Sequence, residues 1–209
     1  MMSENTSSKA TVFVVDDDQA MRNSLKWLIE SVGVPVESFA SADEFLAHFQ
    51  SGRAGCLVLD VRMPGMSGLE LLEHLAQKGL NIPAVIITGH GDVPMAVRAM
   101  KSGAVDFIEK PFNDEALLDA IRRAIAFEEQ QRSQYSEHRQ IKERLAHLTP
   151  REHEVMDMVC NGKSNKEIAN TLGVSAKTIE AHRARVMEKM QAGSLAELVR
   201  MSLTVSDGP

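Results

Sequence analysis

Three aspartates of this 209-residue chain follow strongly apolar stretches, at positions where carboxylates can do chemistry. Asp16 and Asp17 come directly after the run Thr11–Val15, and Asp60 ends the run that begins at Cys56. Short apolar runs that stop at a turn are typical of strands in a parallel sheet, and ligands bind at the carboxyl ends of such strands. We therefore expect the three carboxylates to meet at one edge of a sheet.

Two further polar side chains, Thr88 and Lys110, follow apolar runs in the same way. Carboxylates packed together repel one another unless a cation intervenes, and Mg²⁺ suits such a group because it binds a few carboxylates, keeps waters and contacts phosphate oxygens. A carboxylate can also act as a nucleophile and form an acyl phosphate. We predict that Asp60 accepts a phosphoryl group whose oxygens bind the Thr88 hydroxyl and the Lys110 ammonium. A cis bond before Pro111 would aim this lysine, and the sequence leaves that open.

Residues 10–126 read as an α/β domain in which strands alternate with helices. The expected strands cover residues 11–15, 34–39, 56–60, 83–88 and 104–108. The expected helices cover residues 19–32, a segment that starts at Ser41, then residues 68–78, 93–102 and 114–126. Five strands in this alternation predict a flavodoxin-like, doubly wound parallel sheet.

The rest of the chain has a different character. Residues 127–145 are highly charged, contain no proline or glycine, and are expected to form a helical linker. Residues 146–205 contain dense helix-start signals and predict a second, smaller all-α domain of four helices. Its capping-box sequences start at Thr149, Ser164 and Ser194, and Ser175 can cap a further helix.

The helix that starts after Ser175 has two distinct faces. Its spacing places Ile179, Val186 and Met190 on a buried face, opposite an exposed face. The exposed face consists of Lys177, Glu180, Ala181, Ala184 and Arg185. A tight turn at residues 172–174 precedes this helix, which matches a helix-turn-helix whose small alanines allow close approach to a major groove. Residues 163–189 also carry a local excess of basic side chains, six against three acidic ones.

The charge distribution separates the two halves. Residues 1–126 hold 11 basic and 17 acidic side chains, whereas residues 148–209 hold 8 of each. An acidic first domain suits a cation site and does not suit direct DNA binding. The two cysteines are too few for a disulfide framework, no apolar run reaches the roughly 18 residues of a membrane span, and the N-terminus lacks a signal-peptide core. We expect a cytoplasmic protein without membrane contact.

The first domain resembles the receiver domain of two-component response regulators. The residues that carry this resemblance are Val14–Asp17, the Asp60 strand with Met63–Gly68, Thr88, and Lys110–Phe112. The resemblance implies that Asp60 takes a phosphoryl group from a sensor histidine kinase, and that Thr88 acts as a switch followed by the aromatic side chain of Phe107. It also implies a Mg²⁺ site formed by Asp16, Asp17, Asp60 and the backbone carbonyl of Arg62.

The second domain closely resembles the LuxR/NarL output domain, and the chain as a whole is most similar to FixJ-type nitrogen-fixation regulators. The resemblance implies promoter DNA, RNA polymerase and, after phosphorylation, a second copy of the chain as partners, usually with activation of transcription. By family position, Glu180, Ala181 and Ala184 face bases. The side chains expected at phosphates are Lys166, Lys177, Thr178, His182, Arg183 and Arg185.

Several alternatives stay open at this point. Asp18 is expected to be a helix N-cap, and Phe107 and His182 could each be core residues. Arg62 and His90 are expected to tune water access to the phosphorylated site. A phosphatase with an aspartate nucleophile would need an acidic residue where Arg62 stands, and a phosphate-independent regulator would not need the complete pocket.

Without phosphate, the first domain is expected to cover the second. The expected dimer contact is an exposed face with Val97, Met100, Lys101 and Asp106.

Overall fold

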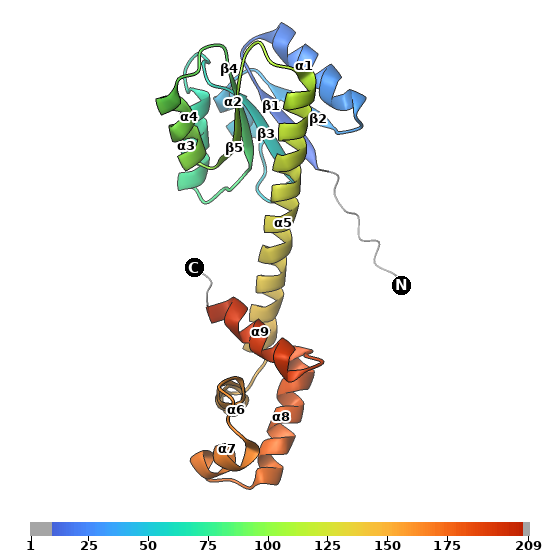
Figure 1. Ribbon diagram of the computed structural model, residues 1–209, viewed down its shortest axis with the longest axis vertical. Helices are drawn as coiled ribbons and strands as arrows, with labels where there is room; N and C mark the ends of the chain where they lie inside the picture. Colours follow the sequence, from blue (N-terminus) through green and yellow to red (C-terminus); the bar gives the residue numbers. More distant parts are fainter. Residues whose placement is uncertain (1–9, 207–209) are drawn as a thin grey trace. The chain divides into compact units, whose positions relative to one another are not determined.

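A computed structural model describes residues 10–206, which divide into two compact units with their boundary in the chain between Gln131 and Arg132 (Figure 1). The first unit contains a five-stranded parallel sheet, and the described part of the second unit is helical. The predicted fold class, an α/β unit followed by a smaller all-α unit, is therefore confirmed.

The strands of the first unit are arranged in the order β2-β1-β3-β4-β5. They are β1 (Thr11–Val15), β2 (Val36–Phe39), β3 (Gly55–Asp60), β4 (Ala84–Thr88) and β5 (Ala104–Glu109). The helices are α1 (Gln19–Ser31), α2 (Ala42–His48), α3 (Gly68–Gln77), α4 (Val93–Lys101) and α5 (Asp114–Ala146). The strand order reverses between β1 and β3, and in doubly wound sheets the ligand-binding crevice lies at this switch point.

Both faces of the sheet are buried, as the continuous apolar strands predict. Phe13, Leu57 and Ile86 point to the face covered by α2, α3 and α4. Their neighbours in the strands, such as Val12 and Val58, point to the opposite face, where α1 and α5 pack. Two separate apolar layers therefore hold the strands in register and fix the position of the strand ends.

The last helix of the first unit does not end at residue 126, where the sequence analysis placed its end. α5 continues without a break through residues 127–145 to Ala146. This segment consists mostly of good helix formers such as Glu, Gln and Arg and has no proline or glycine, so nothing in it interrupts the helix. Charged pairs such as Arg139–Glu143, 3.7 Å apart, add minor support along its exposed side.

The second unit consists of short helices with well-defined starts. They are α6 (Pro150–Cys160), α7 (Asn165–Leu172), α8 (Ala176–Met190) and α9 (Leu195–Ser206). Complete capping boxes form at Thr149 and Ser164, as predicted. The box predicted at Ser194 is only half formed, because the Glu197 carboxylate accepts its hydrogen bond from the backbone N–H of Gly193 (2.8 Å) instead of that of Ser194.

The final turns of α5 are part of the second unit. Ile141 is 2% exposed and packs in the same core as Val155 and Ile179. Two hydrogen bonds reach the ends of other helices, from Arg144 Nη1 to the Met190 carbonyl (3.2 Å) and from His138 Nδ1 to the Thr204 carbonyl (3.0 Å). Residues 132–146 thus complete the core of the second unit.

The structure predicts that Ile141→Ala destabilises the second unit by about 2–4 kcal/mol, because it leaves a cavity in that core. Lys142→Ala is the matched control, since Lys142 is exposed on the next position of the helix and its loss should change stability by less than about 0.5 kcal/mol. Hydrogen exchange of the α6–α9 amides, followed by mass spectrometry, measures the effect. Equal exchange in the two variants would show that α5 does not contribute to this core.

Candidate functional site

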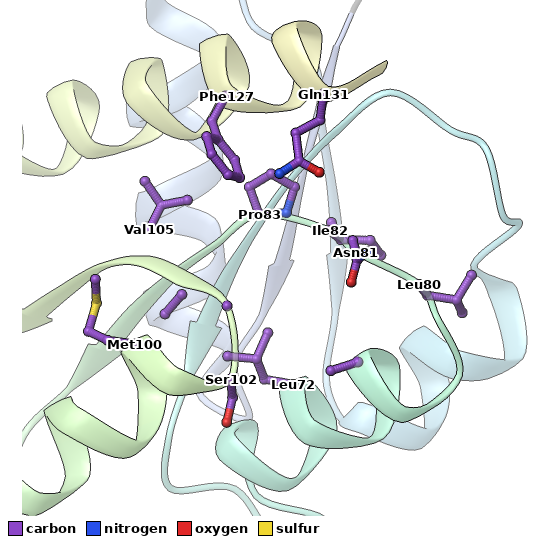
Figure 2. Close-up of a pocket in the computed structure, with 13 residues that line it drawn as sticks. Leu72, Leu80, Asn81, Ile82, Pro83, Met100, Ser102, Val105, Phe127 and Gln131 are labelled. Carbon is purple, nitrogen blue, oxygen red and sulfur yellow. The ribbon is translucent and has the colours of Figure 1, made fainter. Parts of the chain in front are cut away.

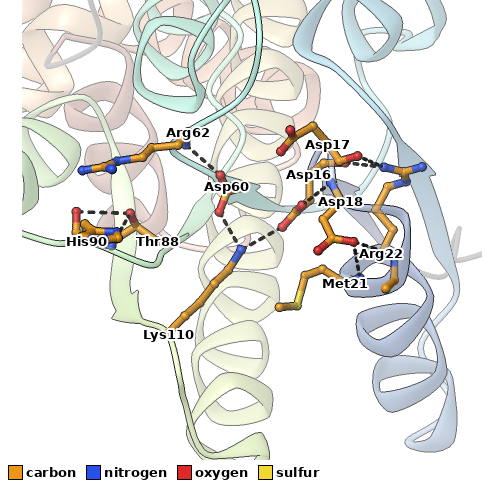
Figure 3. Close-up of polar contacts among 11 residues, drawn as sticks. Asp16, Asp17, Asp18, Met21, Arg22, Asp60, Arg62, Thr88, His90 and Lys110 are labelled. Atoms are coloured by element: carbon orange, nitrogen blue, oxygen red, sulfur yellow. Dashed lines mark hydrogen bonds and ion pairs between the residues drawn. The ribbon is translucent and has the colours of Figure 1, made fainter.

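The ends of β1, β3 and β5 bring three charged side chains together. Lys110 Nζ lies 2.7 Å from Asp60 Oδ1 and 3.0 Å from Asp16 Oδ2 (Figure 3). The two carboxylates are almost completely buried, with 1% of Asp16 and 5% of Asp60 exposed. One ammonium between two carboxylates leaves this buried group negative, which favours a further cation.

The environment shifts the pKa values of two members of this group. Burial raises the pKa of Asp16, against the opposing effect of its hydrogen bonds from Lys110 and from the Asp18 backbone N–H. Burial also acts to lower the pKa of Lys110, but its hydrogen bonds to Asp60 and Asp16 outweigh this effect and raise the pKa. Lys110 is therefore a stable positive charge at the site.

The chain after β3 wraps closely around Asp60. The backbone N–H of Arg62 donates to Asp60 Oδ2 (2.7 Å), so each carboxylate oxygen has a defined partner. A Cβ on Gly68 would lie 2.1 Å from the Asp60 carbonyl oxygen, so only glycine fits there. This close packing sets where the Asp60 carboxylate points.

The neighbouring aspartates have different roles. Asp18 is the N-cap of α1, because its Oδ1 accepts hydrogen bonds from the backbone of Ala20 and Met21, as expected. The side chain of Asp17 is exposed, and its backbone carbonyl accepts a hydrogen bond from Arg22. Arg22 was not singled out by the sequence analysis, because its partners are main-chain carbonyls and no side-chain motif indicates them.

The site offers ligands for the metal that the sequence implies. Within residues 10–206, no three acidic, histidine or cysteine side chains gather closely enough to form a metal cluster by themselves. Mg²⁺ nevertheless needs only one or two carboxylates, since waters and phosphate oxygens complete its octahedron. Asp16 and Asp60 supply two converging carboxylates in a group with excess negative charge, so the residues fit this ion.

Thr88 lies at the end of β4, next to β5, the strand that Lys110 follows. Its side chain is completely buried. Among the described residues, its Oγ1 has only long hydrogen-bond contacts, to the His90 backbone, 3.3 Å to N and 3.4 Å to O. Its carbonyl accepts a hydrogen bond from the Lys110 N–H (2.7 Å), and the Lys110–Pro111 bond is cis. The Thr88 hydroxyl is thus weakly held, on a residue whose backbone contacts that of Lys110.

Phe107 is half-buried and packs against the loop that follows Thr88. A Cβ on Gly91 would come within 2.8 Å of the Phe107 ring and 3.5 Å of Thr88 Cγ2, so the absence of a side chain at Gly91 makes room for the ring. Arg62 and His90 are both exposed beside the site. Phe107 therefore adjoins the loop that contains the threonine.

The first unit also contains a cavity of about 590 Å³, whose lining residues Figure 2 shows. It is lined mainly by apolar side chains, among them Leu72, Ile82, Met100 and Phe127. Pro83 and Ala104 also line it and stand at the starts of β4 and β5, whereas Asp60 stands at the end of β3. The cavity therefore belongs to the opposite edge of the sheet.

The second unit exposes the surface that the sequence analysis predicted. The exposed members of this surface are Lys166, Lys177, Thr178, Glu180, Ala181, Ala184 and Arg185. Ile179, Val186 and Met190 are buried on the other side of α8. Gly173, in the left-handed conformation with φ 66°, ends α7 and allows the tight turn into α8. This is the geometry of a helix-turn-helix.

Three polar side chains of residues 163–189 have partners or positions inside the unit. Arg183 is half-buried and donates to Asn165 Oδ1 (2.7 Å), which links α8 to α7. His182 is half-buried, and its Nδ1 has no hydrogen-bond partner among the described residues. Lys189 donates to the buried carboxylate of Glu152 (2.6 Å), so it joins α8 to α6. The net positive charge that this surface presents is therefore smaller than the excess counted for residues 163–189.

Comparisons with known proteins agree with both units. Residues 12–122 match the response regulator receiver domain, and residues 146–202 match the bacterial regulatory proteins of the luxR family. The chain is a two-component response regulator. Its output unit is a LuxR-family helix-turn-helix domain, so this response regulator is a transcription factor and not a conventional enzyme.

Several relatives share its full two-unit organisation. The response regulator is 48% identical to the transcriptional regulatory protein FixJ of Azorhizobium caulinodans over 198 residues, which cover 95% of this chain and 94% of that protein. It is also 48% identical to nodulation protein W of Bradyrhizobium diazoefficiens, over 95% of this chain and 88% of that one. The solved structure of the response regulator StyR matches it with a TM-score of 0.85 and 46% identity, covering 93% of this chain and 98% of StyR.

Membership of this family has direct consequences. As a response regulator, this protein works with a sensor kinase, and through its LuxR-family helix-turn-helix it binds DNA. Receiver domains generally use Mg²⁺ for phosphorylation. Among the described residues, no helix is both long and apolar enough to cross a membrane.

The contact between Lys189 and Glu152 generates a pH-dependent prediction. The hydrogen bond from Lys189, with a further one from the Thr149 backbone, lowers the pKa of Glu152 from 4.5 to about 2. The folded state therefore gains stability from this carboxylate above pH 4.5, and loses it as the pH falls toward 2. Glu152→Gln should lower the free energy of unfolding at pH 7, and its unfolding curve should approach that of the wild type below pH 4.5.

Urea unfolding followed by circular dichroism across this pH range measures the difference. Glu154→Gln is the matched control, because Glu154 forms an exposed pair with Arg151 on the same helix, where ion pairs contribute little. A difference between Glu152→Gln and wild type that stayed constant with pH would contradict the assignment.

Proposed function

We propose that Asp60 is the phosphoryl acceptor of this response regulator, with a phosphohistidine of its sensor kinase as donor. The observation that supports this best is the contact of the Lys110 ammonium with both Asp60 and Asp16. An oxygen of the Asp60 carboxylate attacks phosphorus, the phosphorus–nitrogen bond breaks as the new phosphorus–oxygen bond forms, and the imidazole leaves with the electron pair and takes up a proton. Lys110 offsets the charge on the phosphoryl oxygens.

Mg²⁺ would be held by Asp16, Asp17, Asp60 and the backbone carbonyl of Arg62, and would neutralise negative charge on the phosphoryl group. Three carboxylates and one lysine leave an excess of negative charge for this ion. The acidic balance of the whole receiver half, 17 acidic against 11 basic side chains in residues 1–126, also favours cation capture.

Thr88 and Phe107 form the proposed switch. The long contacts of the Thr88 hydroxyl to the His90 backbone are at the weak end of hydrogen-bond geometry, so they are readily exchanged for a bond to a phosphoryl oxygen. Movement of Thr88 would change the loop around Gly91, against which the Phe107 ring packs. Phosphorylation would thereby favour one of two packings of α4 and β5.

The same change is proposed to favour a homodimer. Val93, Val97 and Met100 are 77%, 46% and 51% exposed on α4, where their spacing puts them on one side of the helix. Lys101 is exposed next to them, and Asp106 on β5 pairs with Arg123 of α5. An apolar stripe with charged neighbours suits a contact that forms only in the phosphorylated state.

The receiver domain is proposed to span residues 10–126, a helical linker residues 127–145, whose residues from 132 on pack in the core of the second unit, and the DNA-binding domain residues 146–205. A dimer would place two output domains on two-fold related half-sites about 10 bp apart.

Glu180, Ala181 and Ala184 are proposed to face bases, where Glu180 can accept a hydrogen bond from a cytosine amino group. The phosphates would be bound by Lys166, Lys177, Thr178, His182, Arg183 and Arg185. Bound in this way, the regulator is proposed to recruit RNA polymerase and activate transcription.

Incubation of the full chain with Mg²⁺ and acetyl phosphate should add one phosphoryl group, measured by intact-protein mass spectrometry. Asp60→Asn should abolish the gain, since the amide is not a nucleophile for phosphorus. Asp106→Asn is the control, because this carboxylate pairs with Arg123 outside the site and its loss should leave phosphorylation intact.

The same samples distinguish the rival functions. The phosphorylated wild type should sediment as a dimer and Asp60→Asn as a monomer. Continuous hydrolysis of the donor without a modified protein would indicate a phosphatase, and an unmodified protein with no hydrolysis would indicate a phosphate-independent regulator. Either result would contradict the proposal.

Two exposed side chains of α8 should affect DNA binding differently. With an operator recovered from a random-sequence pool, Lys177→Ala should weaken binding to all sequences and reduce the salt slope by about 1, because a phosphate contact is lost. Glu180→Ala should instead relax the preference at one base pair by about 1–3 kcal/mol.

Fluorescence anisotropy with matched and single-mismatch operators at several salt concentrations measures both effects. Lys142→Ala, which removes an exposed charge from α5, is the control and should change neither quantity. If Glu180→Ala weakened binding to every sequence equally, its proposed base contact would be wrong.

A further inference from the structure

Arg22 makes a contact beside the metal-binding aspartates that the proposed function does not use. It lies in the first turn of α1 and is half-buried. A single guanidinium nitrogen, Nη1, donates to the backbone carbonyls of both Asp16 (2.7 Å) and Asp17 (2.9 Å), as Figure 3 shows.

These two carbonyls belong to the peptide units on either side of the Asp17 Cα atom. The orientations of these units set the backbone dihedral angles of Asp17, and therefore the direction of its Cα–Cβ bond. The flanking carboxylates are fixed by other groups. Asp16 accepts from the Asp18 N–H (2.8 Å) and from Lys110, and Asp18 caps α1. The exposed Asp17 side chain depends most on its backbone for its direction.

We propose that Arg22 is a positioning residue. It directs the Asp17 carboxylate toward the Mg²⁺ that Asp16 also binds. This inference rests on the proposed metal-binding role of these aspartates. Groups that orient a metal ligand without touching the metal commonly change metal affinity by about 10–100-fold. Arginine suits this task, because its planar guanidinium holds a fixed donor geometry at the two carbonyls.

The charge of Arg22 and its hydrogen bonds have opposite effects on Mg²⁺ binding. A guanidinium close to a divalent cation repels it, so the charge of Arg22 by itself weakens Mg²⁺ binding. Its hydrogen bonds, according to the proposal, strengthen the same binding. Replacing Arg22 with an uncharged residue therefore changes Mg²⁺ affinity in opposite directions, depending on which effect dominates.

The experiment is calorimetric titration of the unphosphorylated full chain with Mg²⁺ alone, without any phosphodonor. Arg22→Met should bind Mg²⁺ about 10–100-fold more weakly than wild type, although it removes a repulsive charge. Arg22→Lys should recover part of the loss, because an ammonium can still donate to a carbonyl. Lys26→Met is the matched control, since it removes an exposed positive charge one turn later on α1, and should bind Mg²⁺ as tightly as wild type or slightly more tightly.

A double-mutant cycle separates positioning from general destabilisation. If Arg22 acts through Asp17, adding Arg22→Met to Asp17→Asn should cost much less affinity than Arg22→Met costs in the wild type. Additive losses, or unchanged or tighter binding by Arg22→Met, would overturn the inference. If the wild type itself did not bind Mg²⁺, the proposed metal site would fail, and this inference with it.

Discussion

Two carboxylates buried side by side at the end of a sheet repel each other, and here the ammonium group of Lys110 between Asp16 and Asp60 relieves that repulsion. The three residues come from β1, β3 and β5, so the contact forms only when the whole parallel sheet is in register. The same contact leaves a net negative charge, which suits a divalent cation. In the proposed phosphorylation, that cation and Lys110 would offset the charge of the incoming phosphoryl group.

Several residues around this group fix its geometry or that of the adjoining loop. Gly68 lets the chain pass close to the Asp60 backbone, Asp18 caps the helix that follows the acidic turn, and Gly91 leaves space for the ring of Phe107.

The output unit has its own core, and α5 supplies the last part of it through Ile141. The Glu152–Lys189 pair joins α8 to α6, and the face of α8 opposite the buried Ile179, Val186 and Met190 is exposed.

The sequence allowed the fold and the residues that meet at the strand ends to be predicted, because each apolar strand stops at a polar residue and parallel strands end at one edge. Three features were not predicted. The sequence analysis ended the helix at residue 126, although no stop signal stands there, and α5 continues until its end packs in the second unit. The Ser194 box is incomplete because the Gly193 N–H takes the carboxylate of Glu197. Arg22 bonds to main-chain carbonyls, which leave no trace in the pattern of side chains.

The central claim is that a phosphoryl group on Asp60 increases the affinity of the output domain for DNA. The most direct measurement is the affinity of the full chain for a selected operator, with and without acetyl phosphate and Mg²⁺, in the wild type and in Asp60→Asn. We predict that the phosphodonor strengthens binding by the wild type by about 5–150-fold, the usual range for coupled sites, and leaves Asp60→Asn unchanged. Equal operator affinity of the phosphorylated and unphosphorylated wild type would contradict the account.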